Sequence, residues 1–268
     1  MIFERSGKRL TGITEAGRHV LEIVARLLEE TRNLKRLGED YAQQDIGTLD
    51  IATTHTQARY RLPSVVKQFM ARYPRVRLRL HQGNPGQVAD WVASGNADIG
   101  IATESLEASS QLISMPCYQW SHIIIVPKGH PLLKLSTPTA AQLAEWPLIT
   151  YDPTFTGRTR IDHYFEHLGV QPNIVLTAVD SDVIKTYVEL GLGLGIIAEM
   201  AFDKVRDKAL RALPIRHLFG SNTTRLAIRK QTWLRAIDYI FIELFAPQLN
   251  RRIVELALEG KGEFDPSL

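Results

Sequence analysis

The chain is 268 residues long, with 44% hydrophobic residues, 23% charged residues and a formal net charge of +3 at pH 7. This composition is typical of a globular protein, and the length suits one large or two medium α/β units. The small positive charge permits nucleic acid as a partner but does not argue for it. The single cysteine, Cys117, excludes an internal disulfide framework and fits a reducing compartment.

Targeting and cofactor signals give only negative predictions. The N-terminal residues begin with charges and a turn signal and lack the apolar core of a secretory signal peptide. No window approaches the ~20 apolar residues that a membrane span needs. The eight histidines show no metal-ligand spacing, and the chain has no phosphate-binding loop. We therefore expect a cytoplasmic protein with no membrane partner, no cofactor and no metal.

Two patterns occupy the N-terminal region. Residues 3–6 and 9–13 read as two short strands around a turn at Ser6-Gly7. A long helix is predicted to follow, with apolar residues seven apart as in a coiled-coil seam: Val20, Leu27, Leu34 and Tyr41. We expect this helix to pair with a second copy of itself, although lying on a domain would also cover its apolar stripe.

A break at residues 43–47, which we expect to act as a hinge, separates this helix from a region of alternating elements. Strands are predicted at 49–53, 76–81, 98–102, 122–126, 148–151, 173–178, 194–198 and 225–229. Helices are predicted at 58–71, 85–94, 139–143, 158–168, 182–190, 234–245 and 251–258. This rhythm indicates parallel strands with right-handed crossovers. The predicted fold class is α/β, with two Rossmann-like lobes that face each other, preceded by a long coiled-coil helix.

Hydrogen-bond donors follow the first strand of this pattern without interruption: Thr53, Thr54, His55, Thr56 and Gln57. Strand ends of an open parallel sheet meet at one edge, where helix N-termini favour negative charge. Thr103 follows another strand, and Thr156 precedes a helix of the second lobe. Together these residues predict a site for a small anionic or zwitterionic ligand. Thr54 or Thr56 could instead merely cap the helix.

Other polar and aromatic residues leave alternatives open. Trp120 falls near the expected crossing between the lobes, where it could wall the pocket or belong to the core. Arg158 could add a charge to the site or point outward in an ion pair. Asp182 is predicted to cap the helix that begins there. Because no nucleophile, base and orienting group can be assembled from neighbouring motifs, we do not expect an enzyme.

Several motifs resemble, in their order along the chain, those of LysR-type transcriptional regulators. The general ones lie in Phe3–Lys8, Leu10–Gly17, Leu62–Val76, Gly95–Ile99, Gly129–Leu132 and Gly191–Ile196. A second set resembles the CysB/Cbl branch, regulators of sulfur assimilation and cysteine biosynthesis. Its segments are Ile51–Tyr60, Tyr73–Val76, His81–Gly83, Phe155–Arg158 and Asp180–Tyr187. The resemblance covers nearly the whole chain and thins after about Phe202.

This resemblance implies a periplasmic-binding-protein-like effector domain. Its interlobe cleft would bind acetylserine, sulfate or thiosulfate-like anions. The positions that match the family's site are Thr54, Thr56, Gln57, Thr103, Trp120 and Thr156. Residues 1–14 would be a remnant of the wing of a winged helix, and residues 15–46 the dimerising linker helix and hinge. Lobe I would comprise residues 47–118 and 222–268, and lobe II residues 119–221.

The resemblance also implies partners. Members of the family bind DNA through a winged helix-turn-helix, and this chain resembles them only from inside the wing, so the DNA-reading helices are missing from it. DNA and RNA polymerase are expected partners of the complete regulator, and a homodimer or homotetramer is expected. The alternative from another class is a solute-binding protein for a small anion, which the two-lobed cleft fits and the long helix does not.

Overall fold

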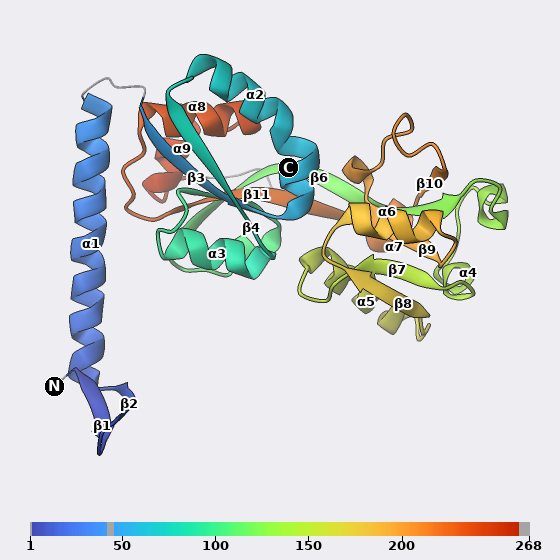
Figure 1. Cartoon of the computed structure of the whole chain (residues 1–268), viewed down its shortest axis with the longest axis horizontal. Helices are drawn as coiled ribbons and strands as arrows, with labels where there is room; N and C mark the ends of the chain where they lie inside the picture. The colour runs from blue at the N-terminus through green and yellow to red at the C-terminus, as the bar shows by residue number, and fades with distance from the viewer. Residues whose placement is uncertain (1, 42–45, 263–268) are drawn as a thin grey trace.

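The computed structural model describes residues 2–41 and 46–262, so residues 43–45 of the expected hinge lie outside the described residues. Side chains are described throughout these ranges except at Glu104 and Thr156. The chain forms a hairpin with a long helix, followed by two α/β lobes placed side by side (Figure 1). The predicted fold class is confirmed.

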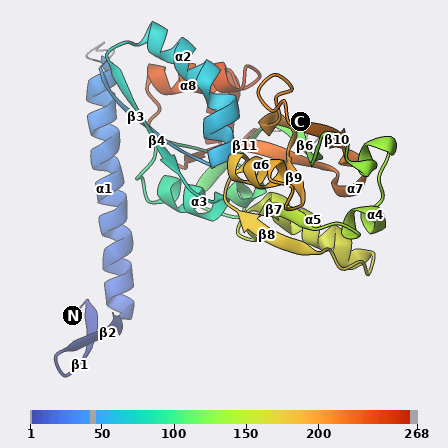
Figure 2. The same ribbon diagram turned by 45° about the vertical axis from the view of Figure 1, so that its right-hand side comes forward.

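The N-terminal part is a two-stranded antiparallel hairpin joined to one helix. Strands β1 (Phe3–Ser6) and β2 (Arg9–Ile13) meet at a turn where Gly7 has a φ of +63°, a conformation that glycine adopts without strain. Helix α1 (Glu15–Tyr41) begins where the Thr14 hydroxyl accepts a hydrogen bond from the Gly17 N–H at 2.9 Å. In both ribbon views the hairpin lies at the end of α1 far from the lobes (Figures 1 and 2).

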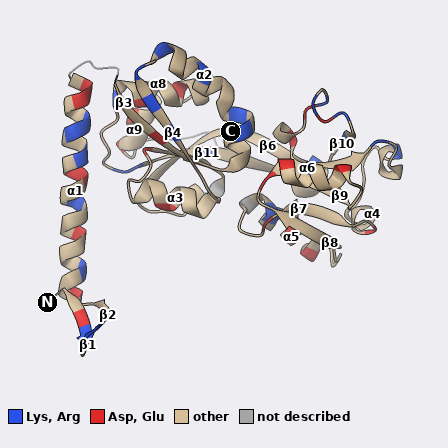
Figure 3. Cartoon of the chain, viewed as in Figure 1, with Lys and Arg blue, Asp and Glu red and all other residues tan. Residues whose placement is uncertain are grey.

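The two faces of α1 differ in kind. Its apolar stripe is exposed, from 39% at Val20 to 79% at Tyr41, and is therefore uncovered in a single chain. The charged residues along the helix (Figure 3) include a row that contacts the first lobe. Glu29 pairs with Arg229 at 2.7 Å, Arg36 pairs with Asp98, and Glu39 pairs with Arg235 at 3.1 Å.

The first lobe, called lobe I below, is a sheet covered on both faces. Its strands are β3 (Gly47–Thr53), β4 (Val76–Gln82), β5 (Ile99–Ala102), β11 (Ser221–Arg229) and the first half of β6 (Leu112–Pro127). Its helices are α2 (Leu62–Arg72), α3 (Pro85–Ala93), α8 (Ala236–Phe245) and α9 (Arg251–Leu258). A large apolar cluster packs α2, α8 and α9 against one face, and a smaller one packs α3 against the other.

The second lobe, lobe II, repeats this layering with different connections. Its strands are the second half of β6, β7 (Leu148–Tyr151), β8 (Ile174–Ala178), β9 (Leu194–Ala198) and β10 (Leu210–Pro214). Its helices are α4 (Ala140–Ala144), α5 (Thr156–His167), α6 (Ser181–Glu189) and α7 (Arg216–Phe219). One apolar cluster joins α4, α5 and α7 to the sheet, and another joins α6 to the opposite face.

Strand directions correct one prediction. The strand order is β4-β3-β5-β11-β6-β9-β7-β8, with β10 paired to β6. Strands β3, β4 and β5 are parallel, as are β7, β8 and β9, but β6 and β11 run antiparallel to their neighbours. The expectation of a purely parallel arrangement was therefore wrong, because these two strands carry the chain from one lobe to the other and back.

Strands β6 and β11 pair with each other at the crossing. Their register runs from Ser221 opposite Ser121 to Arg229 opposite Leu112, with an irregularity between Thr224 and Arg225. The carboxyl ends of β3 and β5 in lobe I and of β7 and β9 in lobe II therefore lie on either side of this ribbon.

In the described residues, no helix combines the length and apolar character that crossing a membrane requires.

Candidate functional site

A cavity of about 40 Å³ lies between the lobes at these strand ends. This volume holds a small ion or a few water molecules. Its lining comes from both lobes: Thr54, Thr56, Gln57, Pro85, Thr103, Trp120, Tyr151, Phe155, Gly157 and Ala198. Among these described lining residues there is no Lys, Arg, Asp or Glu, so the cavity is uncharged and combines a few hydroxyl and amide groups with a largely apolar lining.

Residues Thr54 to Gln57 leave β3 and enter a helix at the mouth of the cavity. The first turns include a π-helical segment, η1 (Gln57–Arg61), ahead of α2. Neither η1 nor α2 has a side-chain cap hydrogen bond. Thr56 is the N-cap of η1, so the interpretation of Thr56 as a side-chain helix cap is not supported. The Thr56 hydroxyl instead interacts with the Tyr151 phenol across the cleft.

Gln57 is held in place by two neighbours on the crossing strands. Its Nε2 donates to Thr224 Oγ1 at 3.0 Å, and the Tyr118 hydroxyl donates to its Oε1. A primary amide has two N–H donors, so one remains after these contacts. The side chain is only 3% exposed, and this orientation fixes the remaining donor at the cavity wall.

Thr103 and Thr156 occupy the corresponding positions on other elements. Thr103 follows β5, is 7% exposed and starts a short 3₁₀ turn, η2 (Glu104–Glu107). Thr156 is the first residue of α5, and its neighbours Phe155 and Gly157 both line the cavity. The structure thus brings five of the six predicted residues to one cavity and places the backbone of the sixth beside it. Their role in ligand binding stays a prediction.

The floor of the cleft is a row of polar side chains on the crossing ribbon. Trp120 lines the cavity, its ring lies 5.1 Å from that of His122, and Asn222 Nδ2 lies 3.4 Å from His122 Nδ1. Trp120 Nε1, His122 Nε2 and Asn222 Oδ1 are buried without a hydrogen-bond partner in the described structure. Burial, and then the charge of Arg160, lowers the pKa of His122 to about 3. The floor is therefore neutral and keeps hydrogen-bonding capacity.

Gly157 lets the backbone approach this floor closely. A Cβ at position 157 would lie 3.0 Å from His122 Nε2 and 3.4 Å from the Trp120 ring. The close approach lets the start of α5 come against the cavity. Helices α3 and α5 both begin here, since Pro85 is the first residue of α3 and Phe155 is the N-cap of α5. At α3, Pro85 has no N–H and the Gln87 N–H donates to Asn84 Oδ1 at 2.9 Å, so this helix contributes mainly its dipole, which favours negative charge.

Sequence reasoning missed Pro85, Tyr151 and Ala198 as lining residues, and of the segment 155–158 it singled out only Thr156, although Phe155 and Gly157 line the cavity. Tyr151 ends β7 and Ala198 ends β9, so the rule that ligands bind at strand carboxyl ends could have found both. The Tyr151 hydroxyl accepts from the Ala198 N–H at 2.9 Å and meets Ser181 Oγ at 2.7 Å. These contacts fix the lobe II wall.

Two charged residues near the site have other partners. Arg158 donates from Nε to Asp162 at 2.6 Å and from NH1 to the Tyr151 carbonyl at 2.9 Å, so it forms an ion pair and does not line the cavity. The prediction that Asp182 caps α6 was wrong. Asp180 is the N-cap and accepts from the Val183 N–H at 2.9 Å. Asp182 makes contacts across the cleft.

Other hollows are less suited to a specific ligand. A groove of about 770 Å³ between α1 and lobe I is open and lined by mixed charges, several of them paired with each other. A polar hollow of about 390 Å³ adjoins the cavity, with Phe155 lining both. The small uncharged cavity is the place where strand ends, helix starts and donors from both lobes coincide.

This chain belongs to the LysR family of transcriptional regulators, since residues 42–250 match the LysR substrate binding domain. It is 52% identical over 262 residues to the HTH-type transcriptional regulator CysB of Burkholderia cenocepacia, covering 98% of this chain and 84% of that protein. SsuR, another HTH-type transcriptional regulator of that organism, is 51% identical over 249 residues, covering 93% of this chain and 81% of SsuR.

A solved structure gives the same grouping. The cofactor-binding domain of the Cbl transcriptional regulator is 46% identical and superposes with a TM-score of 0.75, covering 80% of this chain and 94% of that domain. The predicted resemblance to the CysB/Cbl branch is thereby confirmed. The two lobes form an effector-binding domain of this type.

Proposed function

We propose that this chain is the effector-sensing and oligomerising part of a DNA-binding regulator of sulfur and cysteine metabolism genes. Its effector would be an acetylserine or a sulfate- or thiosulfate-like anion held in the interlobe cavity. The observation that carries the proposal is an uncharged cavity in which hydroxyl and amide groups of both lobes meet the starts of α3 and α5.

The chemistry of this cavity suits a small anion. Neutral donors and helix N-termini stabilise negative charge without a formal countercharge. Each charge-assisted hydrogen bond contributes on the order of 1.5–3 kcal/mol. Four or five of them give micromolar to millimolar binding once ordering costs are deducted. A volume of about 40 Å³ fits a sulfate-sized ion, whereas an acetylserine requires the cleft to open or to extend toward the hollow beyond Phe155.

Ligand binding would act by shifting a population of lobe arrangements. An anion that touches both lobes binds the closed arrangement more tightly than the open one, and only this difference can move the equilibrium. Strand β3 ends at Thr53, beside the cavity, and begins at Gly47, close to the end of α1. Closure would therefore be passed along lobe I to the paired helices.

Calorimetry with sulfate, thiosulfate, N-acetylserine and O-acetylserine tests the proposal. Thr56→Val removes one hydroxyl and keeps the side-chain shape, and should weaken anion binding about tenfold, as expected for one charge-assisted hydrogen bond. Thr159→Val, at an exposed position of α5, is the matched control and should bind normally. Unchanged binding by Thr56→Val would remove this residue from the site. Failure of all four ligands to bind the unaltered protein would overturn the proposed effector class.

The partners follow from the same assignment. The exposed stripe of α1 would pair with a second copy in a homodimer or homotetramer. DNA would be bound through a helix-turn-helix of the kind for which the relatives are named, with RNA polymerase as a further partner in the cytoplasm. Light scattering on Leu27→Glu tests the first point, because a charge in the stripe should shift the protein toward monomer.

We assign residues 47–118 and 222–268 to lobe I and residues 119–221 to lobe II.

A further inference from the structure

The π-helical segment η1 contributes to the cavity and also contacts lobe II. Its first residue, Gln57, lines the cavity, and its middle residues Arg59 and Tyr60 extend to lobe II. π-Helical turns are uncommon and often mark functional sites. Neither Arg59 nor Tyr60 lines the cavity, so the ligand site does not explain them.

Asp182 of lobe II receives these two side chains. The Tyr60 hydroxyl donates to Asp182 Oδ1 at 2.8 Å, and Arg59 Nε lies 2.8 Å from Asp182 Oδ2. Lys185, one turn further along α6, lies 3.3 Å from Oδ1 and 5.2 Å above the Tyr60 ring. Burial alone would raise the pKa of Asp182, but Tyr60, Lys185 and Arg59 lower it overall. The carboxylate is therefore charged and held by donors from both lobes.

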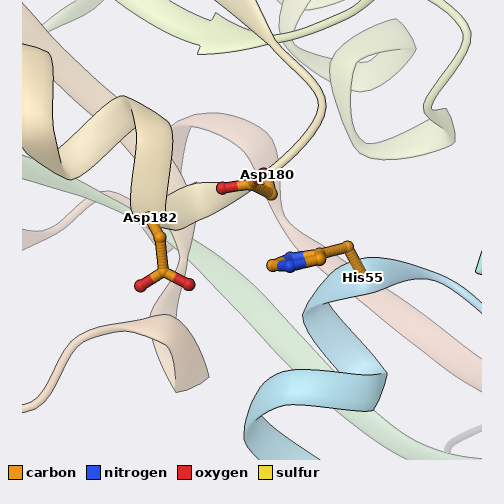
Figure 4. Close-up of side chains that lie close together, drawn as sticks. All are labelled: His55, Asp180 and Asp182. Atoms are coloured by element: carbon orange, nitrogen blue, oxygen red, sulfur yellow. The ribbon is translucent and has the colours of Figure 1, made fainter.

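His55 extends this contact toward the cavity. One ligand-type atom each of His55, Asp180 and Asp182 lies within 4.8 Å of the others, and Figure 4 shows His55 pointing from lobe I toward the two carboxylates of lobe II. The trio does not favour a metal ion, because Arg59 and Lys185 already neutralise Asp182 and Asp180 caps α6. It is better described as a polar contact between lobes.

Apolar packing reinforces the contact. Tyr60 belongs to lobe I, yet its ring packs against the apolar cluster that joins α6 to the lobe II sheet. Opening the cleft would expose this ring and break the Tyr60–Asp182 hydrogen bond together. The contact therefore exists only while the lobes are closed.

We propose that Arg59, Tyr60 and Asp182 form an interlobe latch that sets the fraction of closed molecules and thereby the affinity for the effector, without touching the effector. The inference rests on the proposed function for the identity of the ligand. Apparent affinity scales with the population of the binding-competent state. Residues outside the cavity can therefore set the effector concentration at which the regulator responds.

Tyr60→Phe tests the latch, because it removes one hydroxyl and keeps the packed ring. We expect the dissociation constant for sulfate, measured by calorimetry, to rise about threefold to tenfold. Spin labels at Gln68→Cys and His163→Cys, both exposed and on opposite lobes, should show a longer interlobe distance in ligand-free Tyr60→Phe and the original distance at saturating sulfate. Tyr187→Phe, at a half-buried tyrosine of α6, is the matched control and should change neither quantity.

Asp182→Asn gives an independent variant of the same contact. It keeps an acceptor oxygen for the Tyr60 hydroxyl but removes the negative charge that strengthens this hydrogen bond. Combined with Tyr60→Phe it should weaken sulfate binding by less than the product of the single effects, because both changes act on the same contact. Normal affinity and an unchanged distance distribution in Tyr60→Phe would overturn the latch. Gln57→Glu separates this outcome from failure of the proposed function. It should lose sulfate affinity while its ligand-free distance stays that of the unaltered protein, because Thr224 and Tyr118, the hydrogen-bond partners of Gln57, both belong to lobe I.

Discussion

The two ends of the lobe I strands carry different kinds of polar side chain, charged at the amino ends and neutral at the carboxyl ends. At the amino ends, Asp98 precedes β5 and joins a buried cluster with Arg36, Arg235 and Asp238. At the carboxyl ends, Thr54 and Thr103 leave the same strands and no charged residue lines the described cavity. Charges that are already paired fix α1 to the lobe, whereas neutral donors remain able to receive a foreign anion.

Arg235, at the charged end, is bonded to several partners. Arg235 NH2 donates to Asp238 at 2.9 Å and to the Thr48 carbonyl at 3.1 Å, while its NH1 reaches Glu39 of α1 at 3.1 Å. Burial would lower the pKa of Arg235, but the charges of Asp238, Asp98 and Glu39 raise it overall. The guanidinium is therefore permanently charged and offers nothing to a ligand.

The largest effect is expected from unpairing this end. Arg235→Met keeps an apolar stem of similar length. Among the described residues it leaves Arg36 as the one cationic partner of the buried carboxylates of Asp98 and Asp238, the latter at 3.9 Å. We expect the free energy of unfolding, measured by urea denaturation, to fall by about 3–5 kcal/mol. Arg251→Met removes an exposed arginine paired with Glu255 and should change it by less than about 1 kcal/mol. Equal effects of the two changes would contradict the contrast between buried and exposed pairs.

Acid should act on the neutral end through His122. Its pKa falls from 6.5 to about 3 in the folded protein, so between these values the unfolded chain binds a proton that the folded one does not. The contribution of His122 to the free energy of unfolding should therefore be complete above pH 6.5 and fall as the pH drops, by about 3 kcal/mol at pH 4. His122→Gln should flatten this dependence in urea denaturation at several pH values, whereas His163→Gln, at an exposed position, should not.

A charge placed at the neutral end should repel the ligand. Gln57→Glu exchanges an amide for a carboxylate of the same shape at the cavity wall. Sulfate affinity measured by calorimetry at pH 8 should fall at least tenfold, about 1.4 kcal/mol or more, because two like charges would share a buried site. Gln68→Glu makes the same change on the exposed face of α2 and should leave binding as it was. Tight sulfate binding by Gln57→Glu would show that the anion sits elsewhere.

The smallest effect is expected where α1 meets lobe I through exposed, uncharged contacts. Asn33 Nδ2 donates to the Gln231 carbonyl at 2.8 Å, and its Oδ1 accepts from the Trp233 N–H at 2.9 Å. Asn33→Ala should cost about 1 kcal/mol of docking free energy and speed hydrogen exchange at the Trp233 amide. Lys35→Ala, at a position that is 80% exposed, should not speed it. Unchanged exchange in Asn33→Ala would mean that α1 is held by its ion pairs alone.

Local patterns were sufficient for much of this molecule. The hairpin, α1 and most central strands follow from turn residues, heptads and short apolar runs, each readable within a few residues. The donors at Thr54, Thr56, Gln57 and Thr103 could be placed because strand ends share an edge by geometry. Trp120 was assigned to the candidate site mainly through the family resemblance. An isolated tryptophan in a sequence does not by itself indicate whether its side chain lies in the core or at a site.

The remainder depends on long-range pairing. Strand β6 is 16 residues long, whereas only residues 122–126 were predicted as a strand, and it contains Pro116, a residue type that is disfavoured within sheets. Its antiparallel direction is set by β11, about a hundred residues away. Asp182 is separated from Tyr60 by 122 residues, so its contact across the cleft could not be distinguished from a helix cap. Pairing of this kind is decided by the folded arrangement and not by the neighbouring residues.

The paired crossing strands β6 and β11 restrict the lobe movements that a bound effector could produce. The register between β6 and β11 skips Cys117, because Thr224 faces Tyr118 and Arg225 faces Pro116. Such a bulge gives a ribbon a local point of bending and twist. Both connections between the lobes lie in this one ribbon, so a relative movement of the lobes would have to bend both strands together. Ions and larger metabolites would then differ in how far they close the lobes, and not in the direction in which the lobes move.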